Sequence, residues 1–322
     1  ENVAIGHQAL SADTKGQRNV AVGANALDAQ NFTTATNSQN VAVGYAAGGA
    51  VTTGIENTLI GGLAGDALTT GNYNITLGGS ALGADTAGVA SIAIGYQALQ
   101  VQNFTTATNA FNVAVGHAAG RGITTGKENI LIGGVAGDAL TDADYNIAIG
   151  HTALGLDTLG SRTVAIGHSA LDAQNFTTAT NTYNVAVGHA AGSGVTTGVQ
   201  NTLIGGLAGD VLSDADFNVA IGYAALSTDT LGSSSVAIGR EALFTQNFTT
   251  ATSSYNVAVG FQAGKAVTTA TNNTLIGGLA GDAITTGNDN TAVGGSALTT
   301  NITGANNVAM GVSALKLNTG SN

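Results

Sequence analysis

Histidine is the residue type in this chain best suited to bind a metal or sense pH, because its pKa lies near neutrality. All five histidines directly follow the glycine of a recurring motif: His7, His117, His151, His168 and His189. The last three lie in consecutive repeats, and in a β-solenoid they would stack about 4.8 Å apart. Tyr45 and Tyr96 share this position. The pattern therefore favours a row of exposed side chains, with a metal-binding column of His151, His168 and His189 as the lesser alternative.

Aspartates also recur at equal spacing, in two series: Asp13, Asp85, Asp157 and Asp229, and Asp66, Asp138, Asp210 and Asp282. A calcium site needs several convergent oxygen ligands, and the glycine-aspartate nonapeptide of calcium-binding β-rolls is absent from the sequence. Capping of turns is the favoured role. No nucleophile stands in a unique context, and no glycine-rich phosphate loop opens a helix. The sequence predicts neither an enzyme nor a cofactor.

The element that must position these residues is the motif Asn40-Val41-Ala42-Val43-Gly44, which recurs along the whole chain. The gap between successive motif glycines is 17, as from Gly44 to Gly61, except that every fourth gap is 21, as from Gly95 to Gly116. Four repeats therefore make one 72-residue unit, and we expect every polar residue to have a copy one unit away.

A fixed period of this kind predicts an all-β parallel solenoid with about 17 residues per coil. We expect one array over residues 1–322, with approximate 72-residue units at 19–90, 91–162, 163–234 and 235–306.

Alternation within the motif predicts a strand with two different faces. Val41 and Val43 share one face and Ala42 the other. We expect the branched residues to fill the coil and the alanine face to meet another flat surface, with a similar apolar load in each coil at a shifted position. Stacked asparagines such as Asn40 can form an amide ladder. The residues assigned structural roles on this pattern are Asn40, Val41, Val43, Gly44, Asn112, Val113, Val115 and Gly116.

The 21-residue repeats carry an insertion, Gln30 to Asn37 in its first copy. In a solenoid, extra residues in one coil form a loop on one side. The loop phenylalanines are candidates for outward contacts: Phe32, Phe104, Phe176 and Phe248. The alternative is that each ring folds back and covers the roll.

Composition limits the partners of the chain. Only 8% of the 322 residues are charged, and the net charge of −11 disfavours nucleic acid and anionic membranes. Basic partners and neutral sugars stay open. The sequence has no run of about 18 apolar residues, so no membrane insertion is predicted for this segment. The repeats begin and end in mid-unit, and we expect the chain to be a segment of a longer protein.

The motif resembles known fibre repeats. Asn-Val-Ala-Ile/Val-Gly-x-x-Ala resembles the head repeats of trimeric autotransporter adhesins of the YadA type, and residues 290–298 are similar to the shaft repeats of phage tail fibres. The resemblance implies a left-handed parallel β-roll with two strands per coil and three chains side by side. It also implies an extracellular location, on a cell surface or a virion. The copies that carry it are residues 2–9, 40–47, 112–119, 184–191 and 256–263.

The predicted function is a structural and adhesive segment of a trimeric fibre, without catalysis, that contacts a host-surface receptor or glycan. A homotrimer would also bury more apolar surface than one thin roll can bury alone. Threonine pairs such as Thr52-Thr53, Thr124-Thr125 and Thr196-Thr197 suggest an alternative, a flat ice- or carbohydrate-binding surface. A glycan lyase built on a solenoid is the least favoured reading. The sequence leaves the receptor and the choice between phage and bacterial origin open.

Overall fold

The computed structural model describes residues 1–321, which form 26 β-strands and no helix. Within these residues no helix is long and apolar enough to cross a lipid bilayer. The chain divides into two compact units, Glu1–Ser161 with Thr177–Thr180, and Arg162–Phe176 with Asn181–Asn322. The main division, after Ser161, coincides with the border between the second and third 72-residue repeats.

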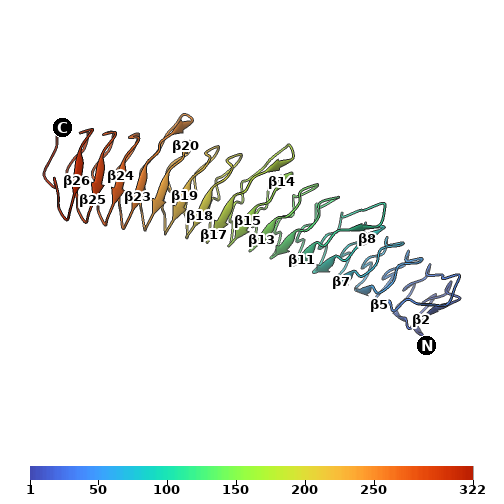
Figure 1. Ribbon diagram of the computed structural model, residues 1–322. Coiled ribbons are helices and arrows are strands. Elements are labelled where there is room, and N and C mark those ends of the chain that lie inside the picture. The colour runs from blue at the N-terminus through green and yellow to red at the C-terminus, as the bar shows by residue number, and fades with distance from the viewer. Residues whose placement is uncertain (322) are drawn as a thin grey trace. The chain divides into compact units, whose positions relative to one another are not determined.

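The first unit contains a parallel sheet built from one three-residue strand per coil (Figure 1). Each strand pairs in register with its neighbour in the next coil, as Val41 pairs with Thr58 and Val43 with Ile60. Its strands, in the order in which they pair, are β1 (Val3–Ile5), β3 (Val20–Val22), β5 (Val41–Val43), β6 (Thr58–Ile60), β7 (Ile75–Leu77), β9 (Ile92–Ile94), β11 (Val113–Val115), β12 (Ile130–Ile132) and β13 (Ile147–Ile149).

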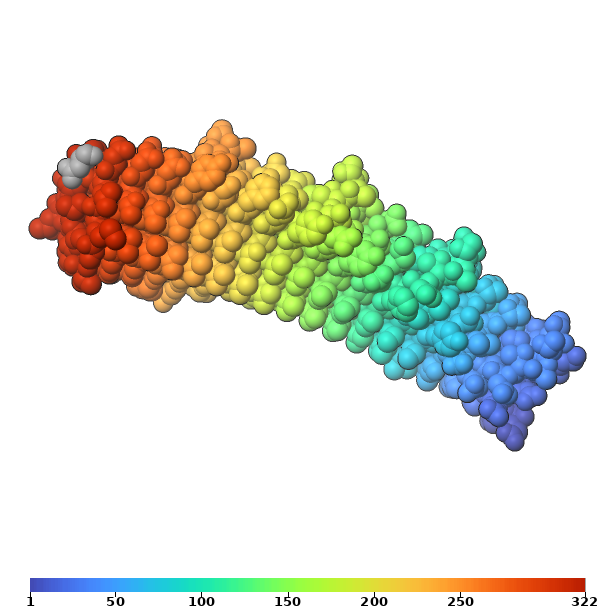
Figure 2. Space-filling view, in the orientation of Figure 1, coloured from blue at the N-terminus to red at the C-terminus, as the bar shows by residue number. Residues whose placement is uncertain are grey.

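The second unit repeats this arrangement. Its successive coils lie as parallel ridges on the face seen in Figure 2. The strands are β15 (Val164–Ile166), β17 (Val185–Val187), β18 (Thr202–Ile204), β19 (Val219–Ile221), β21 (Val236–Ile238), β23 (Val257–Val259), β24 (Thr274–Ile276), β25 (Thr291–Val293) and β26 (Val308–Met310). The prediction of an all-β parallel solenoid with one motif strand per coil, and coils of the predicted length, is therefore confirmed for each unit.

Each of the four insertions contributes one short strand, which pairs with another short strand in the preceding 17-residue coil, and the loops that carry these pairs project near the labels β8 and β20 in Figure 1. Residues of the insertion pair with the preceding coil, as Thr108 pairs with Gly88. The short strands are β2 (Gly16–Gln17), β4 (Thr36–Asn37), β8 (Gly88–Val89), β10 (Thr108–Asn109), β14 (Gly160–Ser161), β16 (Thr180–Asn181), β20 (Gly232–Ser233) and β22 (Thr252–Ser253).

The motif glycine ends each strand because no other residue fits there. Gly44 has φ of 140°, a conformation that side chains other than hydrogen disfavour. A Cβ on Gly44 would also collide with the backbone carbonyl of Gly61 in the next coil. The same close backbone contact between coils recurs at most motif glycines within each unit.

The predicted orientation of the strands was wrong. Ala42 and Ala114, at the strand centres, are completely buried inside the coil, whereas Val41 and Val43 are only half-buried and face outward. The buried polar residue before the strand, an asparagine in most coils, fixes this orientation, because side chains alternate along a strand and Asn40 points inward. Alanine therefore fills the narrow interior, and the branched residues form the outer surface.

Leucines complete the interior by size complementarity between facing positions. Leu59 replaces alanine at a strand centre and is fully buried. Its side chain occupies the space that a Cβ would need at Gly48 and at Gly65 in the facing turns. At Ala21 the facing position is a buried leucine, Leu27. The predicted shift in position of the apolar residue is present, but the load differs between coils, because the coil of Leu59 also buries Leu68 whereas the coil of Ala42 buries the smaller Val51.

The asparagines form hydrogen-bonded ladders inside each unit, which end at the backbone N–H of Ser91 or Ser235 and begin again in the next coil. The Asn57 backbone N–H donates to Asn40 Oδ1 over 2.9 Å, and Asn57 Nδ2 donates to the Gly71 carbonyl over 2.8 Å. Asn74 repeats the first contact with Asn57 Oδ1 at 3.0 Å. Each amide satisfies backbone groups that the turns would otherwise leave buried and unpaired. The ladder therefore fixes the stacking of the turns that precede the strands.

Candidate functional site

The most extensive exposed feature of each unit is an apolar face, which we define as the outward side chains of strands β1 to β13 or β15 to β26 of the parallel sheet. It carries two branched side chains per coil at most positions. Ile75 and Leu77 of β7 are 43% and 47% exposed, and Ile204 of β18 is 37% exposed. Continuous apolar surface of this kind is uncommon on a monomeric soluble protein and marks an interaction site.

An aromatic row runs beside the apolar face. We give this name to Tyr73, Phe111 and Tyr145 in the first unit and to Tyr183, Phe217 and Tyr255 in the second. Each residue stands immediately before the buried asparagine of its coil, and so points outward. The six side chains are 42–61% exposed. They were not singled out from the sequence, because the search for chemistry followed polar residues and the loop phenylalanines.

The backbone at the aromatic row is strained. Tyr73 has φ of 60° and Phe217 of 61°, in the left-handed region that bulky residues avoid. Asparagine adopts this region more readily, and Asn272 and Asn306 occupy the equivalent position in other coils with φ of 59° and 61°. The same left-handed φ occurs at this position in other coils, as at Glu56 (57°) and Gln200 (58°), so the fold imposes it whatever the residue, and asparagine would relieve part of its energetic cost at the aromatic positions.

The histidines form the opposite border of the apolar face, two positions beyond the last outward residue of each strand. All five are exposed. In the second unit the rings of His168 and His189 stack with centroids 5.4 Å apart and planes inclined by 12°, and in the first unit Tyr96 stacks on His117 at 5.7 Å. His151 belongs to the first unit.

Stacking of this kind does not build a metal centre. Because the rings of His168 and His189 are nearly parallel, their in-plane nitrogen lone pairs run side by side and do not converge on one point. Among residues 1–321, no group of three or more His, Cys, Asp or Glu side chains could hold a metal ion. The same part of the chain contains no pocket. The surfaces available for binding are therefore flat.

Comparison with protein-family models, with curated proteins and with solved structures found no match for this chain. Function is therefore argued from the surfaces themselves.

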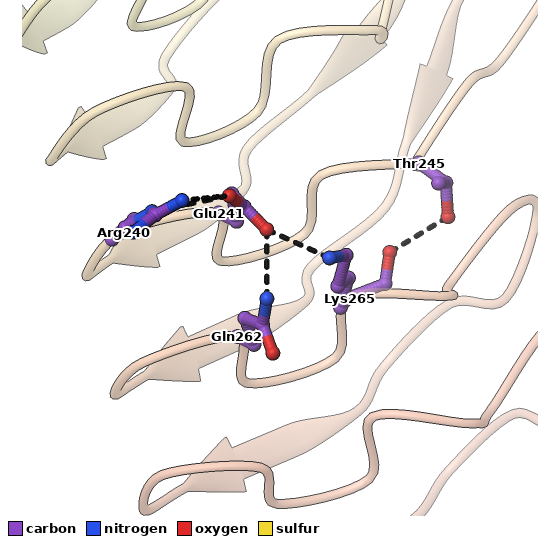
Figure 3. A network of polar contacts seen from close by, with 5 residues as sticks. All are labelled: Arg240, Glu241, Thr245, Gln262 and Lys265. Carbon is purple, nitrogen blue, oxygen red and sulfur yellow. Dashed lines mark hydrogen bonds and ion pairs between the residues drawn. The ribbon is translucent and has the colours of Figure 1, made fainter.

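One polar cluster in the second unit breaks the 72-residue repeat (Figure 3). Glu241 accepts hydrogen bonds from Lys265 Nζ at 2.7 Å and from Gln262 Nε2 at 2.8 Å, and its other oxygen lies 3.0 Å from an Arg240 guanidinium nitrogen. The hydrogen bonds from Lys265 and Gln262 lower the pKa of Glu241 to about 2. Arg240 also lies over the Tyr223 ring, 6.0 Å from its centroid.

The expectation that every polar residue has a copy one repeat away fails at this cluster. Alignment of the third and fourth 72-residue units would have shown it, because the counterparts of Arg240, Glu241, Gln262 and Lys265 are His168, Ser169, Ala190 and Ser193. The four residues come from two adjacent coils and tie them together on the surface. They have no pocket beside them, and we assign them a structural role.

The loop phenylalanines do not project from the roll. Phe32, Phe104, Phe176 and Phe248 are only 6–7% exposed, so the alternative interpretation, in which the rings cover the roll, describes the structure. The rings offer no surface for outward contacts because their insertion is held against the preceding coil. The backbone N–H of Phe104 donates to Asp85 Oδ1 over 3.0 Å.

A buried polar network positions each insertion. Gln102 Nε2 donates to Asp85 Oδ2 at 2.6 Å and to Ser91 Oγ at 3.0 Å, and Gln102 Oε1 accepts from Asn112 Nδ2 at 2.8 Å. Asp85 also accepts from the Gly88 backbone N–H at 3.0 Å, which confirms the predicted turn-capping role. Burial raises the pKa of Asp85, and these hydrogen bonds oppose the rise.

The threonine pairs are partly committed to the solenoid itself. The first hydroxyl of a pair donates to a backbone carbonyl of the next coil, as Thr52 does to Thr69 and Thr196 to Ser213, both at 3.1 Å. The second hydroxyl of one pair, that of Thr197, donates to Asp214 Oδ1 at 2.7 Å. Hydroxyls used in this way are less available for an ordered array of water or sugar contacts.

Proposed function

We propose that this chain is a structural and adhesive segment of an extracellular trimeric fibre, on a bacterial surface or a phage tail, and that it has no catalytic activity. In this proposal each chain winds as a left-handed β-roll, and three chains associate side by side. The resemblance of the motif to adhesin-head and tail-fibre repeats supports the assembly and the location.

The observation that carries the proposal is the apolar face. It continues from coil to coil in each unit, and its centre consists of branched aliphatic side chains such as Ile130, Ile132 and Ile204. Removing apolar surface from water stabilises an assembly by about 25 cal/mol per Å². A flat face that repeats along the chain suits association with copies of the same chain, in which every coil meets its equivalents.

The face that we assign to assembly differs from the one expected from the sequence. The alanine side of the strand is sealed inside the coil, as Ala114 and Ala148 show. Only the valine and isoleucine side remains to meet another chain. The stabilising effect of assembly therefore comes from larger side chains than the sequence analysis assumed.

The mass of the full chain in solution tests this proposal. Light scattering after size-exclusion chromatography should give three times the mass of one chain, which is 31.4 kDa. Replacing Ile204 and Ile276 of the apolar face by aspartate should dissociate the trimer, because each copy would bury unpaired carboxylates at the interface.

A matched control is available in the same unit. Val211 is 40% exposed, close to the exposure of Ile204 and Ile276, but lies outside the strands of the sheet. Val211→Asp should leave the trimer intact. A wild-type chain that stays monomeric at micromolar concentration would contradict the proposal. A trimer that persists when Ile204 and Ile276 are replaced by aspartate would contradict it too.

A further inference from the structure

The aromatic row has a regular spacing that the rest of the apolar border lacks. In the first unit Tyr73 precedes β7, Phe111 precedes β11 and Tyr145 precedes β13, and one further strand of the sheet lies between each of these pairs. The aromatic residues therefore occur in every second coil. At about 4.8 Å per coil, successive rings are roughly 9.6 Å apart along the sheet.

The second unit repeats this spacing. Tyr183, Phe217 and Tyr255 precede β17, β19 and β23, again with one strand between neighbours. Shorter residues occupy the equivalent position of the coils between them, namely Gln200 and Ser234. In this unit the row thus alternates ring and neutral polar side chain, whereas Ala90 and Glu128 stand between the rings of the first unit.

Backbone hydrogen bonds keep the row in register. The N–H of Phe217 donates to the Val199 carbonyl at 3.1 Å, and Val199 is the neighbour of Gln200 in the preceding coil. The N–H of Tyr73 donates in the same way to the Ile55 carbonyl at 3.1 Å. Since the sheet holds each position one coil above the last, the rings cannot drift relative to one another.

Extended β-1,4-linked polysaccharides match this surface. Their successive sugars are turned over relative to each other, so that every second ring presents the same face, and one disaccharide is close in length to two coils. The C–H groups on the face of a pyranose ring are attracted to the electron-rich face of an aromatic side chain. We propose that the aromatic row binds a single extended chain of a neutral β-1,4-linked glycan, of the glucose or N-acetylglucosamine type, with one ring stacked on every second sugar.

The charge of the protein is consistent with a neutral ligand. The chain carries a net charge of −11, which repels polyanionic polysaccharides over the range of the Debye length. Gln200, Ser234 and Asn272, which occupy the row between or beside the rings, offer neutral donors and acceptors for sugar hydroxyls.

The inference rests on the proposed function in one respect, because it names the receptor chemistry of an adhesive segment. It uses a different part of the surface. The centre of the apolar face is assigned to assembly, and the aromatic row at its border is assigned to the glycan. Binding and oligomeric mass can therefore fail separately.

The test uses the full chain and isothermal titration with cellohexaose and chitohexaose as probes. Maltohexaose, whose α-1,4 linkages curve the chain, serves as the reference sugar. The row variant replaces all six aromatic residues by asparagine: Tyr73→Asn, Phe111→Asn, Tyr145→Asn, Tyr183→Asn, Phe217→Asn and Tyr255→Asn. Asparagine already occupies this position at Asn272 and Asn306, so the variant should fold, which circular dichroism checks.

The control variant removes exposed aromatic rings from the opposite border of the apolar face, through Tyr45→Ala, Tyr96→Ala, Tyr223→Ala and Phe261→Ala. We expect one or both β-1,4-linked hexasaccharides to bind and maltohexaose not to bind. The row variant should lower the affinity by about tenfold or more, as the loss of central aromatic contacts does at other interfaces. The control variant should retain the affinity of the wild type.

Three results would overturn the inference. They are an absence of binding to both β-linked probes, equal binding of maltohexaose, or an unchanged affinity in the row variant. Loss of the trimer in the row variant would also overturn it, because the row would then belong to the interface between copies of this chain. A monomeric wild type that binds cellohexaose would instead contradict the trimer and leave the glycan site standing.

Discussion

The inner and outer faces of the same three-residue strands behave in opposite ways. On the inner face Ala114 and Leu131 are completely buried and fit against facing glycines or leucines, and the asparagine ladder satisfies the turns. On the outer face Val113, Val115 and Ile132 stay partly exposed. The inner face stabilises the coil, and the outer face remains available to contact another molecule.

This contrast separates residues that stability requires from residues that it does not. The inner positions accept only small or closely complementary side chains, because the coil is narrow and close-packed. The outer positions vary among Val, Ile, Leu and Thr, and their borders vary more widely still. Side chains at the outer positions and their borders, such as the aromatic row, are therefore not fixed by the packing inside the coil.

The largest expected effect comes from the inner backbone. Gly116 has φ of 145°, and a side chain there would collide with the Gly133 carbonyl. Gly116→Val should destabilise the surrounding coils by about 4 kcal/mol or more, because backbone strain and overpacking add. Hydrogen exchange should show local opening that spreads to the neighbouring coils. Unchanged protection in β11 and β12 would contradict the assigned close contact.

A matched pair of truncations in β12 compares the two faces directly. Leu131→Ala removes a fully buried side chain and should cost about 3 kcal/mol through lost burial and a cavity. Ile132→Ala, at the next residue, removes a side chain that is already 37% exposed and should cost the isolated chain about 1 kcal/mol or less. Urea denaturation of the dissociated chain measures both. An equal loss in the free energy of unfolding for the two variants would contradict the assignment of Leu131 to the buried face and Ile132 to the exposed one.

The buried carboxyl of Asp85 should make stability depend on pH in one direction. Burial raises its pKa in the folded state above the ordinary value of 3.8. The folded chain therefore binds the proton of the Asp85 carboxyl more tightly than the unfolded chain does. The contribution of this proton to the free energy of unfolding is complete below pH 3.8 and is lost as the pH rises through the raised pKa. Relative to wild type, Asp85→Asn should become more favourable as the pH rises through this window. Denaturation midpoints at several pH values measure the trend, and a constant difference would contradict the raised pKa.

The surface carboxyl of Glu241 should show the smallest effect and the opposite sign. Its pKa falls from 4.5 to about 2 in the folded state, so its contribution is present above 4.5 and is lost as the pH falls through about 2. The advantage of wild type over Glu241→Gln should therefore shrink on acidification. Lys265 is 38% exposed and Glu241 13%, so solvent partly screens the pair. An NMR titration of the Glu241 side chain measures the pKa directly, and an ordinary value would contradict the network in Figure 3.

The sequence was sufficient to predict the solenoid, the coil length and the turn-capping role of Asp85 and its copies Asp13, Asp157 and Asp229. These depend on period and on turn chemistry, which are local properties. The alternation of side chains alone did not predict the orientation of the strand correctly. It places Val41 and Ala42 on opposite faces but does not say which face is buried. The buried asparagine held that information: a residue that forms a ladder must share its face with Ala42, two positions later.

The surfaces proposed for binding were harder to predict for a physical reason. The ring of Phe104 is covered because its insertion is tied to Asp85 in the preceding coil, a contact between residues far apart in sequence. Tyr73 and Phe111 belong to one row only when the longer and shorter coils are stacked in register. The Glu241 cluster likewise needs two adjacent coils to be recognised.

Thiol labelling of adjacent positions in β11 tests the central claim most directly. The chain has no cysteine, so Ala114→Cys and Val115→Cys each introduce a single thiol, on the inner and outer face respectively. The account predicts that the thiol at position 114 is protected from maleimide at every protein concentration. The thiol at position 115 should react in the dilute, dissociated chain and become protected as the chains associate. Equal labelling rates at the two positions in the dilute chain would contradict the assignment of the faces, and labelling at position 115 that never falls with concentration would contradict assembly through the outer one.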